Sequence, residues 1–216
     1  MINLSLNLPD GDAPKFLFMG AHSDDIEIGC GGTILRLIQK YPNCRIYWTV
    51  FSTLGVRKAE AEKGAELFAG KNLEKTFLRE YADGFMPWNG AEIKATFEEI
   101  KKEVAPDVVF AHTRKDAHQD HRLINELTWN TYRNHLVLEY EIPKFDGDLG
   151  QPNFFVPLEK EHYEAKVAHL MTAFGSQRSK KWFEESTFMG LMRLRGMECV
   201  SSSGYAEAFH CRKAVL

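Results

Sequence analysis

The alternation of short apolar runs with longer helical segments is the strongest constraint on how this chain can fold. Apolar runs rich in β-branched and aromatic residues predict strands at residues 16–20, 45–51, 76–78, 107–111 and 136–142. Helical patterns are predicted at residues 32–40, 57–69, 91–104, 120–134, 159–174 and 180–195. This βαβα order is typical of a parallel sheet with helices on both faces. We therefore predict a Rossmann-like α/β fold, with a last strand at residues 206–212 on an edge.

Length and composition indicate one globular domain that covers residues 1–216. A chain of this size can bury roughly 70% of its unfolded surface. The formal net charge of −3 gives no broad attraction to nucleic acid or to anionic membranes, so neither is expected as a partner. No run approaches the roughly 20 apolar residues of a membrane span. Residues 1–15 also lack the basic and apolar regions of a signal peptide.

The cysteines predict a reducing environment. Cys30, Cys44, Cys199 and Cys211 show neither a CxxC spacing nor the density of a disulfide framework. Free thiols of this kind are typical of cytoplasmic proteins, so we expect a cytoplasmic location.

A long segment at residues 143–157 interrupts the regular alternation. It carries glycines, prolines and the aromatic residues Phe145, Phe154 and Phe155. Loops of this length are often functional, and the alternative is a surface loop whose aromatic side chains pack onto the domain.

Two clusters of metal-binding residue types follow predicted strands. Ala21–His22–Ser23–Asp24–Asp25 comes after the first strand, and residues 116–121 follow the fourth. Ligands of open α/β sheets bind outside the carboxyl ends of the strands, so both clusters are expected at one edge of the sheet. His22, Asp25 and one histidine of the second cluster would give zinc three ligands and leave a position for water.

Each cluster alone also has an ordinary structural explanation. Asp25 could cap a helix, and His118 and His121 could be solvated residues at a helix start. The convergence of both clusters at strand ends favours a metal site. Other divalent ions, iron among them, suit the same donor types.

The glycines of the first cluster do not form a phosphate-binding motif. Gly29, Gly31 and Gly32 leave Ile34 where the last glycine of GxGxxG should fall, and no GK[ST] follows. We expect these glycines to let the start of a helix, at residue 32, pack closely against the first strand. The chain also lacks the GxSxG motif of serine hydrolases.

The two clusters, in this order, resemble those of the PIG-L/LmbE family of zinc-dependent N-deacetylases. That family has a strand followed by A-H-P-D-D and a glycine pair, and later H-x-D-H. The corresponding residues here are 21–25, 31–32 and 118–121. The residues 57–60 resemble the family's arginine-led helix, and residues 204–209 resemble its C-terminal A-E-x-F segment.

The resemblance implies roles for individual residues. His22, Asp25 and His121 match the zinc ligands, and Asp24 matches the general base. His118 matches the histidine that stabilises the oxyanion or protonates the leaving amine. Asp120 would fix the orientation of a histidine. Arg57 would hold substrate or buttress the site.

Zinc-dependent removal of an N-acetyl group from a small amino sugar or sugar conjugate is therefore the expected activity, and a homo-oligomer is plausible for this family. Two alternatives stay open. One is an amidase that cleaves a larger acyl group from a sugar-thiol conjugate, and the other is an inactive, metal-stabilised carbohydrate-binding protein. The chain departs from the family's pattern at two positions: Ser23 stands in place of the proline, and the glutamate that usually follows Gly55 is missing.

Overall fold

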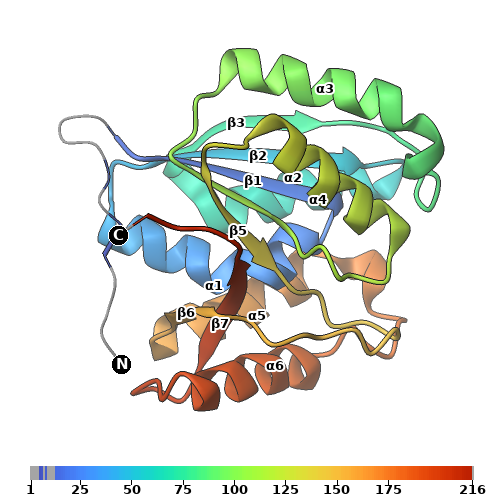
Figure 1. The fold of residues 1–216 in the computed structure, drawn as a ribbon. Coiled ribbons are helices and arrows are strands. Elements are labelled where there is room, and N and C mark those ends of the chain that lie inside the picture. Colours follow the sequence, from blue (N-terminus) through green and yellow to red (C-terminus); the bar gives the residue numbers. More distant parts are fainter. Residues whose placement is uncertain (1–4, 7, 9–12, 216) are drawn as a thin grey trace.

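The computed structural model describes residues 5–6, 8 and 13–215 (Figure 1). The strands are β1 (Lys15–His22), β2 (Arg45–Ser52), β3 (Leu73–Leu78), β4 (Val108–His112), β5 (Leu136–Tyr140), β6 (Phe154–Pro157) and β7 (Ala206–Cys211). The α-helices are α1 (Asp25–Lys40), α2 (Val56–Ala69), α3 (Gly90–Glu103), α4 (Gln119–Thr131), α5 (Lys160–Ala173) and α6 (Glu185–Glu198). Short 3-10 turns lie at Gly70–Asn72, Met86–Asn89 and Gly175–Gln177.

One sheet with the strand order β3-β2-β1-β4-β5-β7-β6 forms the centre of the molecule. Strands β1 to β5 are parallel, whereas β7 pairs antiparallel with both β5 and β6. The predicted edge position of the last strand is therefore wrong, because β6 covers it and forms the edge. In Figure 1, α3 and α4 lie on one face of this sheet, and α1, α2, α5 and α6 cover the other. The predicted α/β fold with helices on both faces is confirmed.

The central strand β1 shows why both faces must be covered. Successive side chains of a strand point to opposite faces. Phe16 and Phe18 pack in the core beneath α1, α2 and α5, and Leu17 and Met19 pack in the core beneath α3 and α4. All four side chains are completely buried. Such an uninterrupted apolar run is typical of a parallel strand covered on both sides.

The order of the strands reverses between β1 and β4. From β1 the chain moves outward through β2 and β3, then returns to the other side of β1 to add β4 and β5. The loops after β1 and β4 therefore leave the sheet in opposite directions and open a crevice at its carboxyl edge. This topological switch point brings the two predicted clusters together.

Helix α1 begins at Asp25, so the predicted start at residue 32 is wrong. The glycines lie inside this helix, where they allow neighbours to approach it closely. A Cβ atom on Gly29 would lie 2.3 Å from the ring of Tyr140, and one on Gly31 would lie 2.5 Å from that of Phe68. The predicted close packing is present, but its partners lie in β5 and α2 rather than in the first strand, and it requires that these helix positions carry no side chain.

The segment 143–157 is not a loop throughout. Its last residues form the edge strand β6, which pairs with β7 from Phe154 to Pro157. The aromatic and β-branched residues of this strand suit a sheet, but its partner lies far away in the sequence and the flanking prolines concealed it. Phe145 lies in the part that remains a loop, and its side chain is 75% exposed.

A buried ion pair joins the C-terminal strand to α1. The Glu207 carboxylate accepts hydrogen bonds from the backbone N–H groups of Gly32 and Thr33, at 2.8 and 2.6 Å. The Lys166 ammonium group lies 2.6 Å from Glu207 and donates to the carbonyl of Ile28. Because the charges pair and their remaining hydrogen-bonding groups bind the backbone, this buried pair fixes α1 in position.

Other boundaries differ from the predictions mainly by a few residues. The third strand begins at Leu73 rather than residue 76, and α6 begins at Glu185 rather than residue 180. All four cysteines are free thiols, as predicted. Among the described residues, no helix is both long and apolar enough to cross a membrane.

Replacing Gly29 with alanine should destabilise the protein by about 1–3 kcal/mol, because the new methyl group would overlap Tyr140. This loss should exceed the gain of about 1 kcal/mol in helix propensity. Gly190, inside α6, has no atom within 4 Å of an added Cβ, so Gly190→Ala should instead stabilise the protein by about 0.5–1 kcal/mol. Urea unfolding measures both changes, and shifts of the same sign would contradict the packing explanation.

Candidate metal and catalytic site

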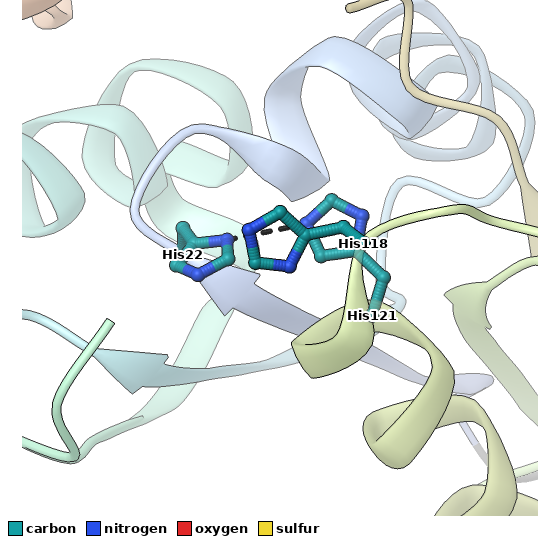
Figure 2. Close-up of side chains that lie close together, drawn as sticks. All are labelled: His22, His118 and His121. Atoms are coloured by element: carbon teal, nitrogen blue, oxygen red, sulfur yellow. Dashed lines mark hydrogen bonds between the residues drawn. The ribbon is translucent and has the colours of Figure 1, made fainter. Parts of the chain in front are cut away.

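The two predicted clusters meet at the carboxyl edge of the sheet. His22 is the last residue of β1, and Asp25 is the first residue of α1. His118 is the N-cap of α4, and His121 lies in its first turn. Figure 2 shows the three imidazoles side by side. They line a pocket of about 450 Å³ together with Asp24, Asp25 and Arg57.

Three donor atoms converge at the distances that a metal ion requires. The Nδ1 atom of His22 lies 3.1 Å from Nε2 of His121 and 3.4 Å from Oδ2 of Asp25. The Asp25 and His121 atoms lie 3.5 Å apart. A tetrahedral zinc ion with bonds of about 2.0–2.1 Å holds its ligand atoms roughly 3.3–3.4 Å apart. The triad predicted from the sequence therefore fits zinc.

Neighbouring carboxylates direct the lone pairs of both histidines into this triad. The Nε2 atom of His22 lies 2.9 Å from Asp83 and 3.2 Å from Asp120, so its proton belongs on Nε2. The Nδ1 atom of His121 lies 2.9 Å from Asp116. The opposite nitrogens then face each other as acceptors, which is favourable only with a cation or a proton between them.

The charge balance of the site also fits a divalent cation. Its buried carboxylates are Asp24, Asp25, Asp116 and Asp120. Arg57 and Lys144 are the cations paired with them, and each is shared with a further carboxylate, Glu60 or Asp148, so negative groups outnumber positive ones. Burial disfavours the imidazolium of His22, but hydrogen bonds to Asp120, Asp25 and Asp83 outweigh burial and raise its pKa well above the ordinary value. The surplus thus favours a positive charge in the triad.

His112 lies beside the triad but does not complete it. Its ring stacks on that of His121 at 3.8 Å, and its Nε2 atom is 3.2 Å from Asp25. The backbone N–H of Ala21 donates to the same Nε2 atom at 2.9 Å, which occupies its lone pair. His112 is therefore better suited to pack against His121 than to bind an ion.

His121 is held in the neutral form that metal binding requires. Burial and the neighbouring His112 lower its pKa to about 4, although Asp25 and Asp116 oppose this shift. Burial would raise the pKa of Asp25, but the histidines around it outweigh burial and hold this pKa well below its ordinary value. A neutral imidazole and an ionised carboxylate are the protonation states of metal ligands.

Asp24 has one oxygen bound and one free. Its Oδ1 atom accepts a hydrogen bond of 2.6 Å from Arg57. Within the described part of the chain, its buried Oδ2 atom has no hydrogen-bond partner. Burial raises the pKa of Asp24, with Arg57 acting in the opposite direction. A carboxylate that lines the pocket, keeps one oxygen without a partner and has a raised pKa is suited to accept a proton.

Arg57 is anchored on both sides. Its guanidinium group bonds to Asp24 and, at 2.7 Å, to Glu60, which in turn accepts hydrogen bonds from Ser176. These contacts orient Arg57 toward Asp24. Of the two roles expected from the sequence, they favour buttressing the site over binding substrate.

The hydrogen bonds of His118 determine which of its nitrogens can donate. Its Nδ1 atom accepts from the backbone N–H of Asp120 at 3.2 Å, which places the proton of the neutral ring on Nε2. Burial and the nearby His22 lower the pKa of His118. A neutral ring with an Nε2–H group in the pocket can donate a hydrogen bond.

Asp120 contacts two parts of the site. Besides facing His22, its carboxylate accepts from the backbone N–H groups of Gly84 and Met86, at 2.7 and 3.1 Å. It therefore fixes both a histidine and the loop after β3. Asp120 therefore contacts a histidine, as predicted. Asp116 makes the same kind of contact with His121, and the sequence analysis assigned it no such role.

The sequence placed Asp116 in the second cluster, but it did not show that Lys144 would pair with it. Lys144, from the loop after β5, lies 3.0 Å from Asp116 and also bonds to Asp148. Asp83 was likewise missed, because it lies in a loop without a motif. The membership of Asp116 in the second cluster was the signal of its role, whereas Asp83 gave none.

The fold and the site together define an α/β protein with a candidate metal site of histidines and an aspartate at the switch point of its sheet. The PIG-L family model, described as GlcNAc-PI de-N-acetylase, matches residues 17–132, more than half of the chain. The chain belongs to the PIG-L family of deacetylases, which are hydrolases of amide bonds.

Individual relatives agree with this assignment. The chain is 29% identical over 168 residues to an uncharacterized deacetylase of Escherichia coli K12, YaiS, covering 71% of this chain and 87% of that protein. The N,N'-diacetylchitobiose deacetylase of Pyrococcus horikoshii shares the fold with a TM-score of 0.70 at 22% identity, over 96% of this chain and 86% of that one.

The same fold also serves another reaction. GalB, the 4-carboxy-2-hydroxymuconate hydratase of Pseudomonas putida KT2440, has a TM-score of 0.73 at 16% identity, covering 94% of this chain and 98% of that one. Fold likeness alone therefore does not determine the reaction, and the side chains of the site must carry the functional argument.

Replacing Asp116 with asparagine should weaken zinc binding roughly 10- to 100-fold. The asparagine amide has no negative charge with which to accept the hydrogen bond from Nδ1 of His121 and hold its ring in place. Competition with a chromophoric chelator measures this affinity. Asp146→Asn is the matched control, since Asp146 lines the pocket without bonding to a histidine in the described structure. Equal affinities of the two variants would contradict the proposed orienting role of Asp116.

Proposed function

We propose that this protein is a zinc-dependent deacetylase that removes the acetyl group from an N-acetylated amino sugar or a conjugate of one. The convergence of His22, Asp25 and His121 beside the free oxygen of Asp24 carries this proposal. A metal site for binding alone would not need an unpaired carboxylate oxygen in the same pocket. The site therefore favours hydrolysis over the inactive binding protein.

His22, Asp25 and His121 would hold the ion. When bound, zinc supplies Lewis-acid polarisation of the amide carbonyl and lowers the pKa of water. Asp24 would take the proton of the attacking water on Oδ2 while Arg57 holds Oδ1. Asp24 would then deliver this proton to the nitrogen of the leaving amine, whose bond to the acetyl carbon breaks. Acetate and the free amine are the products.

His118 would donate a hydrogen bond from Nε2 to the oxygen that becomes negative as the amide is attacked. Because its Nδ1 accepts from Asp120, this assignment favours oxyanion stabilisation over protonation of the amine. A donor directed at developing charge in a pocket of this kind accelerates reactions by about 10²–10³.

We further propose that residues 1–216 act as one catalytic domain in the cytoplasm. The free thiols support the location, and structural relatives that match over nearly the whole chain support the single domain.

Asp24→Asn should lower the rate of acetate release by about 10²–10⁴, because the amide cannot accept the proton. Acetate is measured with a panel of N-acetylglucosamine derivatives, using metal-free, zinc-restored and variant protein. Zinc stoichiometry should be the same in the variant and the wild type. Zinc-independent release, or full activity of Asp24→Asn, would refute the proposed mechanism.

His118→Ala should lower kcat by about 10²–10³ with a smaller effect on KM, since the hydrogen bond strengthens only as charge develops. His118→Gln, whose amide N–H can donate, should recover part of the lost rate. Steady-state kinetics on one N-acetyl substrate measures both. A change confined to KM would assign His118 to substrate binding instead.

A further inference from the structure

Of the ten large apolar side chains that are exposed in the described part of the chain, four lie on α6 or after it. The other six belong to segments that follow β2, β3 and β5. They are Leu54, Val56, Phe85, Trp88, Phe145 and Leu149. The carboxyl ends of these parallel strands share one edge of the sheet. Single exposed apolar residues are ordinary, but several on one face mark a binding surface.

Two of these side chains belong to the wall of the active-site pocket. Leu54 is 49% exposed and Phe145 is 75% exposed, and both line the cavity that contains the histidines. Trp182, from a third segment, lines the same cavity. We propose that these three residues form an apolar subsite, and that the substrate carries an aryl or alkyl substituent on its amine fragment. This inference rests on the proposed deacetylase function.

Trp182 has the properties of a fixed platform. It is half-buried against the main core, and its ring packs edge-on against Phe183 at 5.6 Å. The Nζ atom of Lys180 lies 5.6 Å from the centre of the indole ring. Leu54 and Phe145, in contrast, expose much of their surface to water. Contact with an apolar group would remove that surface from water and so contribute to affinity.

The substituent belongs on the amine side of the scissile bond because of the reaction itself. The amide carbonyl must lie beside His22, Asp25 and His121, where the pocket is polar. An acetyl group adds only one methyl carbon to that carbonyl, so it contributes little apolar surface. The sugar and its aglycone form the larger fragment and extend from the polar centre toward the apolar wall.

The charged side chains on the outer part of the pocket are mixed. Asp83 and Asp146 line it, and so do Lys144 and Lys180. This mixture gives no net attraction to an anionic membrane surface. A neutral apolar aglycone needs no charged partner there.

The test compares methyl and octyl glycosides of N-acetylglucosamine as substrates. The wild type should show a kcat/KM roughly tenfold higher for the octyl glycoside, as expected for partial burial of the chain against apolar side chains. The double variant Leu54→Ser/Phe145→Ser should reduce this ratio to near one. Leu194→Ser is the matched control, because Leu194 is 52% exposed on α6 and does not line the pocket.

A second measurement does not depend on catalysis. Octyl glucoside has no amide, and below its micelle-forming concentration its binding can be followed by calorimetry. Binding should weaken roughly tenfold in the double variant and remain unchanged in Leu194→Ser. Loss of binding in the double variant supports the apolar subsite even where no substrate is turned over.

The outcomes separate this inference from the proposed function. Absence of acetate release from both glycosides would refute the proposed function. Equal kcat/KM values for the two glycosides, with octyl glucoside binding unaffected by the double variant, would overturn the apolar subsite and leave the deacetylase intact. A preference for N-octanoyl over N-acetyl glucosamine would move the apolar group to the acyl side and overturn the inference. A lower oligomeric mass of the double variant, with an unchanged ratio of kcat/KM for the two glycosides, would also overturn the inference. Leu54 and Phe145 would then form a contact between copies of the chain.

Discussion

The convergence of three electron-rich atoms at one point is the constraint on which the site depends. His22, Asp25 and His121 place a nitrogen, an oxygen and a nitrogen within 3.5 Å of each other. Without a positive charge between them, these atoms repel. The outward N–H groups of the two histidines donate hydrogen bonds to carboxylates, and this keeps the inward lone pairs free. The carboxylates belong to Asp83, Asp116 and Asp120. Stability and chemistry therefore compete here, because the fold must hold an arrangement that is unfavourable until a cation binds.

Elements far from the site hold α1, and with it Asp25, in a fixed position. The Lys166–Glu207 pair binds the interior of α1, the helix that begins with Asp25. Gly29 lets the same helix lie against Tyr140, whose hydroxyl donates to the carbonyl of Met19 in β1. The C-terminal strand and the central strand thus hold one helix from two sides. This explains how the last part of the chain, which contributes no residue to the metal triad, can affect its geometry.

The pocket has two chemically distinct parts. Charged and polar groups surround the triad, and their mutual contacts leave few choices for the orientation of Asp24 or His118. The outer wall is built from loops after the strands, where Leu54 and Phe145 are 49% and 75% exposed. Loops of this kind can vary without disturbing the sheet. The division fits a family in which one catalytic arrangement serves substrates with different outer parts.

The sequence by itself determined the α/β alternation and the two clusters, because apolar periodicity and metal-ligand residue types are local properties. It also indicated that both clusters lie at one sheet edge, since parallel strands end on the same side. Tertiary structure alone decided the rest. The glycines were predicted to lie at a helix start beside the first strand, whereas they lie inside α1 and their neighbours are Tyr140 and Phe68. The strand β6 needed a partner distant in the sequence, and the roles of Asp116 and His118 depended on which neighbour accepts or donates each hydrogen bond. Such partnerships form between segments far apart in the chain, so no local pattern records them.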